Sequence, residues 1–345
     1  MRRRRIKVVG SGAIYHCMTR CVNGEFRIGE DYEKEVLRKS LWKCAEFSGV
    51  EILTYCIMSN HFHVLVLVPH VEGVSDDELM RRYELLYPKP TKYQQASIKV
   101  MKAHLKENGA EAKKIREKLL KRMHDVSEFM KLVKQRYSVW YNKTHNRYGT
   151  LWADRFKSVL VQGAGNPLQT MAAYIDLNPV RAGLVSDPKD YRFSGYGEAE
   201  GGNTSKAKEG LRTVMDFSVV MREADMRKQL NDPTYKEEES VLKKGESYLT
   251  RYRTFLYAKG RDLSHEEYLK ELDRHGVLGK KEILRLRVRY FTDGLVLGGQ
   301  EFVEEIFANN RELFGKKRKT GARKMRGADW SGLHVIRDLR REVFG

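Results

Sequence analysis

Two histidines separated by a single residue are the first side chains in this sequence whose spacing indicates chemistry. His61 and His63 follow a short turn at residues 58–60 and begin an apolar run. On a β-strand, residues i and i+2 point to the same face, so both imidazoles converge while Phe62 points into the core. Two neutral imidazoles can share one divalent cation. An isolated His-x-His is also typical of an ordinary half-buried strand, so a metal site requires a further group.

A tyrosine and an amide four residues apart supply that further group. Pro167 suits the first turn of a helix, and Pro179 disfavours helical geometry at the residue before it. The sequence therefore predicts a helix over residues 167–178. Tyr174 and Asn178 then share one helix face. A helical tyrosine is by itself usually a packing residue, but beside the histidine pair it predicts a phenol nucleophile and an amide oxygen facing one cation.

The elements that must position these residues predict an α+β fold. The expected strands cover residues 13–22, 50–57, 61–68 and 156–162, and the expected helices cover 32–48, 125–143 and 167–178. The turn at 58–60 joins two of the strands into a hairpin. Residues 71–124 are charged and poor in glycine, which predicts a helical insertion. A catalytic domain would span 1–200, and a mainly helical, basic extension with a DNA-binding role would span 201–345.

Composition and charge indicate the class of partner. The chain has 345 residues, with 65 Lys and Arg against 46 Asp and Glu, and a net charge of +19. Clustered excess positive charge is typical of a polyanion binder. No stretch approaches the roughly 18–20 apolar residues of a membrane span, and the N-terminus lacks the apolar core of a secretion signal. The four cysteines form no CxxC pair, so we expect reduced, buried thiols and a cytoplasmic, nucleoid-associated protein.

Three segments resemble a known family. They are YCIMSNHFHVLV at residues 55–66, GTLWADRFKS at 149–158 and YIDLNPVRAGLV at 174–185. Together and in this order they resemble the HUH single-tyrosine transposases of insertion sequences, most closely the REP-associated tyrosine transposase branch. The resemblance covers about Arg5 to Tyr196. It implies a ferredoxin-like or RRM-like antiparallel sheet with helices on one side, which agrees with the order of elements expected above.

The resemblance also implies roles for individual residues. His61 and His63 match the metal ligands, Asn178 matches the polar residue that completes the metal site, and Tyr174 matches the nucleophile. The metal would be Mg²⁺ or Mn²⁺. The implied activity is that of a transposase: an endonuclease and strand transferase that nicks and rejoins single-stranded DNA at hairpin elements through a 5′-phosphotyrosine. Some relatives are monomers and others dimers, so both states stay open.

Basic residues near the predicted site and in two charge runs are the candidate DNA contacts. They are Arg2, Arg3, Arg4, Arg5, Arg20, Arg155, Lys157, Arg181, Lys316, Lys317, Arg318 and Lys319. Aromatic side chains beside basic ones can stack on bases. Tyr15 and Tyr148 are the candidates for that role. A second tyrosine pair, Tyr137 and Tyr141, is expected to pack against the sheet.

Two alternative functions stay open on the sequence alone. The first is a DNA-binding regulator on the same fold that has lost catalysis. The second is a nucleic-acid hydrolase that uses the histidine pair as a metal site, with Tyr174 merely structural. That hydrolase needs a third ligand, for which Asp176 and Glu51 are the candidates. A covalent protein–DNA adduct distinguishes the transposase from both alternatives.

Overall fold

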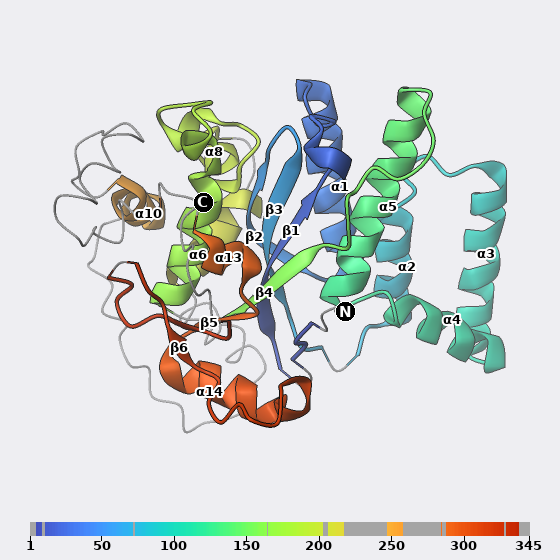
Figure 1. Ribbon diagram of the computed structural model, residues 1–345. Helices are drawn as coiled ribbons and strands as arrows, with labels where there is room; N and C mark the ends of the chain where they lie inside the picture. The colour runs from blue at the N-terminus through green and yellow to red at the C-terminus, as the bar shows by residue number, and fades with distance from the viewer. Residues whose placement is uncertain are drawn as a thin grey trace.

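The computed structural model describes residues 5–8, 11–71, 73–163, 165–202, 206–216, 247–257, 284, 288–327 and 329–337. Within these ranges, seven strands form one sheet in the order β2-β3-β1-β4-β5-β7-β6 (Figure 1). The strands are β1 (Ala13–Arg20), β2 (Glu51–Ile57), β3 (His61–Val68), β4 (Lys157–Val161), β5 (Val296–Gly298), β6 (Arg323–Lys324) and β7 (His334–Val335). Their order and the helices around them confirm the predicted α+β fold.

The four longer strands form the antiparallel part of the sheet, β2-β3-β1-β4. Strand β3 is buried along almost its whole length because its apolar run covers both faces. A strand that is apolar on both faces requires helices on each side of the sheet. In the register between β1 and β3, Met18 pairs with His63 and Arg20 pairs with His61. The predicted hairpin is also present, since β2 and β3 are neighbours joined at residues 58–60.

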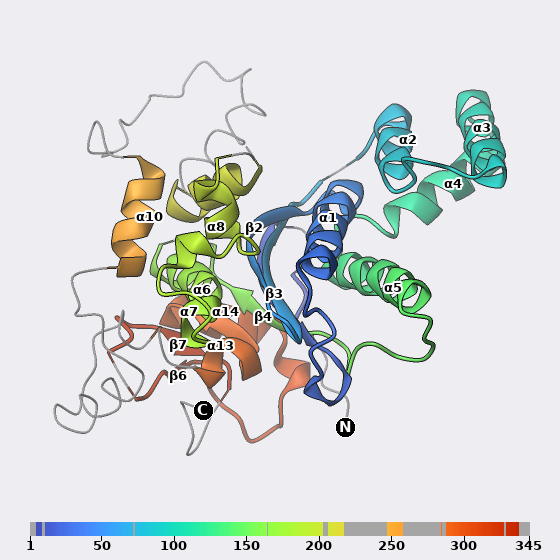
Figure 2. The same ribbon diagram turned by 90° about the horizontal axis from the view of Figure 1, so that it is seen from above.

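Helices cover both faces of this antiparallel sheet, so the expectation of helices on one side is wrong (Figures 1 and 2). Helices α1 (Asp31–Ser48) and α5 (Val126–Thr144) pack against one another on one face, and α6 (Asn166–Asp176) contacts β2, β3 and β4 on the other. Helix α1 begins at a reciprocal capping box between Glu30 and Glu33. The side chain of Asp125 accepts two backbone N–H bonds at the start of α5, as its position in the sequence predicted.

The predicted insertion is helical and has a small core of its own. It contains α2 (Asp76–Leu85), α3 (Lys92–Glu107) and α4 (Ala110–Leu120). Leu79, Leu105 and Leu119 pack there against Phe47 of α1. Figure 2 shows these three helices beyond α1, on the side away from the sheet.

The described part of the C-terminal third contains the expected helices and three unexpected strands. Its helices are α10 (Tyr248–Tyr257), α13 (Arg289–Asp293) and α14 (Gln300–Asn309). Strand β5 pairs in parallel with β4, and β7 and β6 follow it at the edge of the sheet. Strands of two or three residues are too short to show a hydrophobic period, so the sequence did not predict them. The division at residue 201 stays a prediction, but Val296 and Tyr290 share the main core with β3.

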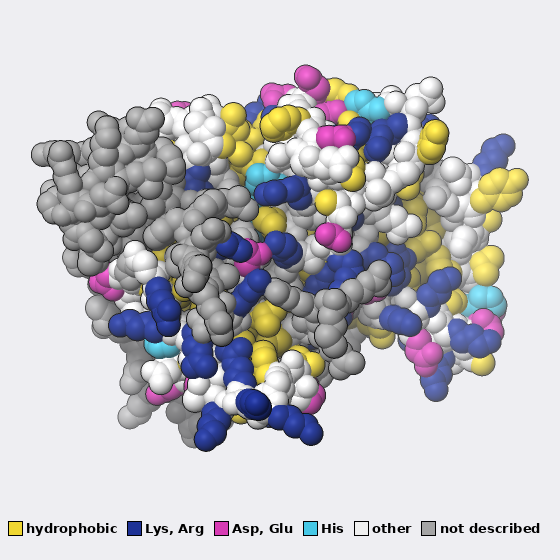
Figure 3. Space-filling model, viewed as in Figure 1, with side chains coloured by type: hydrophobic (Ala, Val, Ile, Leu, Met, Phe, Trp, Pro, Cys, Tyr) yellow, Lys and Arg dark blue, Asp and Glu magenta, His cyan; other side chains and the backbone are white. Residues whose placement is uncertain are grey.

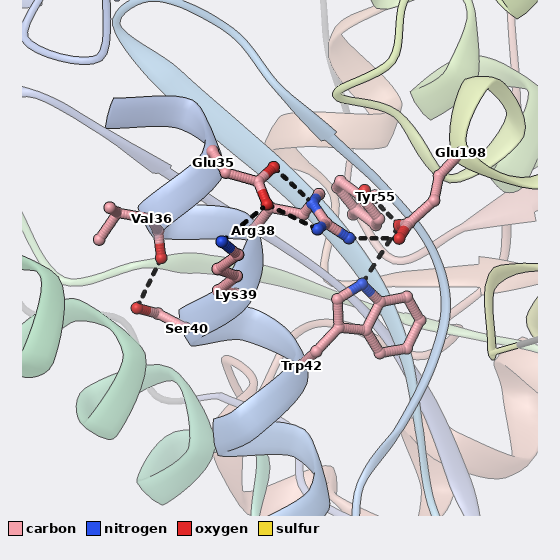
Figure 4. A network of polar contacts seen from close by, with 8 residues as sticks. All are labelled: Glu35, Val36, Arg38, Lys39, Ser40, Trp42, Tyr55 and Glu198. Atoms are coloured by element: carbon pink, nitrogen blue, oxygen red, sulfur yellow. Dashed lines mark hydrogen bonds and ion pairs between the residues drawn. The ribbon is translucent and has the colours of Figure 1, made fainter. Parts of the chain in front are cut away.

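A buried polar network holds the segment that follows α6 against the sheet and α1. After the single turn α7 (Asn178–Arg181) and the 3-10 turn η2 (Pro188–Asp190), helix α8 (Gly195–Glu200) lies against α1 and β2. The Glu198 carboxylate accepts hydrogen bonds from Arg38, from the Trp42 indole at 3.2 Å and from the Tyr55 hydroxyl (Figure 4). Arg38 also donates to Glu35 at 2.7 and 2.8 Å. We call these five side chains the Glu198 network.

All four cysteines are buried and none forms a disulfide, as predicted. Burial raises the pKa of the Cys21 thiol to about 11, which keeps it protonated at neutral pH. Among the helices in the described ranges, none combines the length and apolar character needed to cross a bilayer.

Candidate active site

The four residues predicted for catalysis and metal binding line one pocket of about 240 Å³. Arg20 and Arg181 line the same pocket. The sequence did not single out its remaining lining residues, which are Met18, Met58, Ala182 and Thr292. Thr292 lies in α13, so the C-terminal third contributes to the pocket wall.

The register of the sheet explains why the two histidines meet the tyrosine helix. His61 and His63 are alternate residues of β3, so they point to one face. Helix α6 packs on that face and brings Tyr174 above it. The ring centroids of His61 and His63 lie 5.1 Å apart, and the ring of Tyr174 lies 6.2 Å from that of His63. His63 and Tyr174 are buried, whereas His61 is half-buried at the pocket mouth.

His63 is oriented by a second histidine that the sequence analysis did not identify. His16 on β1 places Nδ1 2.9 Å from the carbonyl oxygen of Phe291 and Nε2 2.8 Å from Nδ1 of His63. A carbonyl only accepts, so the proton of neutral His16 lies on Nδ1. Its Nε2 therefore accepts from the Nδ1–H of His63. The lone pair of His63 is thereby assigned to Nε2, the other ring nitrogen.

Burial keeps both of these imidazoles neutral. It lowers the pKa of His16 to about 4, and it holds the pKa of His63 well below its ordinary value, with the neighbouring histidines and arginines adding to the effect. Neutral imidazole is the form that binds a cation.

His61 is oriented by its neighbour in the turn. The side-chain amide of Asn60 donates to the carbonyl oxygen of Gly24 at 2.9 Å, which leaves the amide oxygen as the acceptor. His61 Nδ1 lies 2.6 Å from that oxygen and donates to it. The lone pair of His61 is therefore on Nε2, as in His63. Both imidazoles have the tautomer in which one ring nitrogen is held by a protein acceptor, which is typical of metal-binding histidines.

Tyr174 is enclosed by aromatic rings and by a guanidinium group. The ring of Phe291 packs 4.7 Å away, centroid to centroid. The Arg181 guanidinium lies 4.1 Å over the centroid of the tyrosine ring. Arg181 is held there by hydrogen bonds of 2.6 Å to the carbonyl oxygens of Tyr174 and Leu284. A fixed positive charge over the ring stabilises the phenolate form of a tyrosine.

The helix that carries Tyr174 ends earlier than predicted. Helix α6 ends at Asp176, and Pro179 then lies in the first turn of α7, where its missing N–H costs nothing. The side-chain nitrogen of Asn178 donates to the carbonyl oxygens of Ile175 at 3.1 Å and Tyr174 at 3.3 Å. These bonds leave the amide oxygen as the atom that Asn178 can offer to the pocket.

The donor set of the pocket fits a divalent cation that keeps part of its own hydration. It comprises two imidazole nitrogens and one amide oxygen, all of them neutral. Within the described ranges, no group of three or more His, Cys, Asp or Glu side chains is arranged to hold a metal ion. Three neutral ligands leave the positive charge of the cation available to an anionic substrate.

Neither carboxylate expected to complete a hydrolase site lies in the pocket. Asp176 accepts hydrogen bonds from the hydroxyls of Thr54 at 2.8 Å and Tyr252 at 2.6 Å and from the backbone of Tyr196 at 3.2 Å. Burial raises the pKa of Asp176 to about 7. Glu51 begins β2 and borders a different pocket. The expectation that either residue serves as third ligand is wrong, because both side chains lie elsewhere.

The candidate DNA contacts have different environments, and their roles stay predictions. Arg5 donates to the carbonyl oxygen of Phe156 and lies over its ring, and Lys157 pairs with Asp293 at 2.7 Å. Arg155, Lys316, Lys317 and Lys319 are exposed, whereas Arg318 donates to the carbonyl oxygens of residues 320 and 321. Arg2, Arg3 and Arg4 lie outside the described residues. Figure 3 shows that Lys and Arg side chains gather across the middle of one face and below it, over α14.

The tyrosines outside the pocket that the sequence analysis named differ in burial. Tyr148 is 94% exposed, which suits a stacking residue, whereas Tyr15 is 3% exposed. The expectation that Tyr15 stacks on a base is wrong, because the β1 strand directs its ring into the core. Tyr137 and Tyr141 are buried on α5 and do not line the pocket, as predicted. Tyr137 packs against Trp140 and Trp152.

Comparison with known proteins gives one distant structural neighbour to report. No family model matches the sequence, and no curated protein matches it. The neighbour is a REP-associated tyrosine transposase solved in complex with a REP hairpin. The two chains are 14% identical, with a TM-score of 0.37 over 57% of this chain and 84% of the other.

Proposed function

We propose that this chain is a metal-dependent transposase that nicks and rejoins single-stranded DNA at hairpin elements through a 5′-phosphotyrosine intermediate. The observation that carries the proposal is the meeting of Tyr174, His61, His63 and Asn178 around one pocket. A structural tyrosine would not need to lie beside two oriented imidazoles. The three sequence segments that resemble the HUH single-tyrosine family include all four residues.

The reaction consists of two displacements at the same phosphorus atom. In the first, the hydroxyl oxygen of Tyr174 attacks the phosphorus, the bond to the 3′ oxygen breaks, and the strand leaves with a 3′-hydroxyl. The phenol proton passes to solvent and the 3′ oxygen takes one up, so charge and protons balance. In the second, a 3′-hydroxyl attacks the phosphotyrosine and restores Tyr174. The covalent link conserves the phosphodiester bond, so neither step needs a nucleotide cofactor.

The residues of the pocket have separate tasks in this reaction. Arg181 stabilises the tyrosine anion from above the ring, and Arg20 borders the same pocket at the end of β1, where it meets the phosphate of the strand. A divalent cation such as Mg²⁺ or Mn²⁺, held by His61, His63 and Asn178, would supply Lewis-acid charge at the phosphoryl oxygens. The basic face in Figure 3 supports binding of the flanking DNA.

A covalent-adduct assay tests this proposal. The full chain would be incubated with hairpin-bearing single-stranded DNA from the flanks of its own gene, in Mg²⁺ or Mn²⁺, and resolved on a denaturing gel. We expect an adduct with the wild type and none with Tyr174→Phe or His61→Ala. Tyr141→Phe is the matched control, because Tyr141 is a buried tyrosine outside the pocket, and it should form adduct normally.

Two other outcomes would support the alternative functions. Hairpin binding with a steep salt dependence but no adduct under either metal would indicate a DNA-binding regulator. Cleavage that survives Tyr174→Phe but not His61→Ala would indicate metal-dependent hydrolysis, and the covalent mechanism would then be wrong.

A further inference from the structure

His16, which lies behind His63, makes hydrogen bonds that packing alone does not require. His16 is 1% exposed and lies between two partners, the backbone carbonyl of Phe291 and the ring of His63. Both of its ring nitrogens are used, and the two histidine rings stack with centroids 5.0 Å apart. A buried imidazole is expensive to desolvate unless both nitrogens are satisfied. An apolar side chain at this position would fill the same space at lower cost.

The carbonyl oxygen of Phe291 fixes the donor and acceptor at each hydrogen bond from Phe291 through His16 to His63. The carbonyl of Phe291 can only accept, so the proton of His16 must face it, and the other nitrogen must then accept from His63. The result is one permitted tautomer for His63, with Nδ1 protonated and Nε2 unprotonated. If His16 were absent, Nδ1 of His63 would have no acceptor there, and the ring could take either tautomer or turn.

We propose that His16 is a positioning residue for the metal ligand His63, and that it transmits to the pocket an orientation set by the backbone of the C-terminal segment at Phe291. This inference rests on the proposed function, since it assigns His63 to a cation. It adds a role for His16 and for residues 288–293, neither of which belongs to the three segments that carry the family resemblance. Partners of this kind typically change metal affinity by roughly 10–100-fold.

Two substitutions separate the two hydrogen bonds of His16. His16→Asn places an amide nitrogen close to the position of Nδ1, so it can still donate to Phe291, but it ends short of His63. His16→Gln reaches further, and its amide oxygen can take the place of Nε2 and accept from His63. A residue needed only for packing would respond to both changes alike.

The measurement is Mn²⁺ binding to the full-length protein, followed by the electron paramagnetic resonance signal of free Mn²⁺. We expect His16→Asn to raise the dissociation constant about 10–100-fold. We expect His16→Gln to stay within about threefold of the wild type. Thermal unfolding without metal reports the structural cost of each substitution separately. In the adduct assay, His16→Asn should raise the half-saturating Mn²⁺ concentration and leave the maximal rate nearly unchanged.

The outcomes distinguish this inference from the proposed function. If the wild type binds Mn²⁺ and His16→Asn weakens that binding selectively, the inference holds even where no adduct forms. Equal Mn²⁺ affinity in His16→Asn and the wild type would overturn it, as would an equal loss in both variants. A wild type that binds no Mn²⁺ at millimolar concentration would also overturn it, while an adduct formed without metal would leave the tyrosine chemistry standing.

Discussion

Two buried polar clusters of this molecule use their polar atoms differently. In the Glu198 network, Arg38 donates from three nitrogens to two carboxylates, and Glu198 accepts on both oxygens (Figure 4). In the pocket, His63 and Asn178 each use one polar atom for orientation, and both side chains line the pocket. A saturated cluster holds the fold together, whereas a cluster with unused polar atoms is the kind that a ligand can complete.

The number of polar atoms left unused distinguishes a structural cluster from a candidate functional one, whereas the degree of burial does not. Glu198 and His63 are both largely buried, and each of the two clusters contains a group whose pKa is shifted from its ordinary value. The Glu198 carboxylate, together with burial, holds the pKa of Tyr55 well above its ordinary value. A search based on shifted pKa values alone would therefore choose both clusters.

Removal of Glu198 should give the largest change in stability and leave catalysis intact. Glu198→Ala leaves Trp42 and Tyr55 without their acceptor and Arg38 with only Glu35. Removing one partner of a buried ion pair typically costs about 3–5 kcal/mol, and we expect about 3 kcal/mol here. Urea unfolding measures the loss. Adduct formation per folded molecule should equal that of the wild type.

The matched control for this prediction is Glu46→Ala on α1, the helix that carries Arg38 and Trp42. Glu46 makes ion pairs with Arg81 and Lys206 at the surface, and exposed pairs of this kind contribute less than about 1 kcal/mol. A loss of adduct in folded Glu198→Ala protein would show that the network also serves the pocket and would remove the distinction drawn above.

Asp176 also belongs in this comparison, because it is buried two residues from Tyr174 and its carboxylate is saturated by three donors. Its folded-state pKa of about 7 lies above the ordinary value. Between roughly pH 4 and pH 7 the folded state therefore keeps a proton that the unfolded state loses, and stability falls as pH rises through this window. Asp176→Asn should remove that part of the pH dependence, which amounts to a few kcal/mol.

Urea unfolding of the wild type and Asp176→Asn at pH 5 and pH 7.5 measures this effect. The free energy of unfolding of the wild type should fall, relative to that of Asp176→Asn, as the pH rises from 5 to 7.5. Adduct formation should survive the substitution, since the carboxyl is not directed to the pocket. Weaker Mn²⁺ binding by Asp176→Asn, with loss of adduct, would instead revive the carboxylate-ligand hypothesis.

The smallest expected effect concerns surface charge, where a side chain held by intramolecular hydrogen bonds can again be compared with exposed ones. Arg318 is held by backbone carbonyls, while Lys316, Lys317 and Lys319 beside it are exposed. Changing the three lysines to alanine should weaken binding of hairpin DNA at all sequences alike. Each lost phosphate contact should reduce the slope of log affinity against log salt by about 1.

Three exposed lysines of the insertion are the control for this prediction. Lys99, Lys106 and Lys113 lie on α3 and α4, far from the sheet (Figure 2). Their replacement by alanine changes the net charge by the same amount and should leave the salt slope unchanged. An equal change in both triple variants would show that overall charge, and not the 316–319 loop, governs binding.

The central elements of the fold were predictable because each has a strong local signal. Strand β3 has an apolar run after a turn, and α5 has an acidic cap, and both lie within one or two residues of their predicted bounds. The pocket residues His61, His63, Tyr174 and Asn178 were predictable because they lie in compact motifs. The helix end at Asp176 was missed, since Pro179 begins a new turn instead of ending the helix.

The remaining parts of the site depend on tertiary pairing and have no local signal. His16 was visible as a residue of β1, but only its register with β3 places it diagonally beside His63. Phe291 packs on Tyr174 and Thr292 lines the pocket because β5 joins the edge of β4. A strand of three residues is too short to show a hydrophobic period in the sequence. The short strands of the C-terminal third therefore concealed its contribution to the pocket.

The bond between His16 and Phe291 also has a consequence for the order in which the protein is made. More than two hundred residues separate Phe291 from His63 in the chain. At about 5–20 residues per second, the ribosome needs roughly 10–45 s to bridge that interval. The nascent polypeptide thus has its tyrosine and both imidazoles well before the carbonyl that selects the tautomer emerges. The tautomer of His63 is therefore selected only after the segment that contains Phe291 has been made.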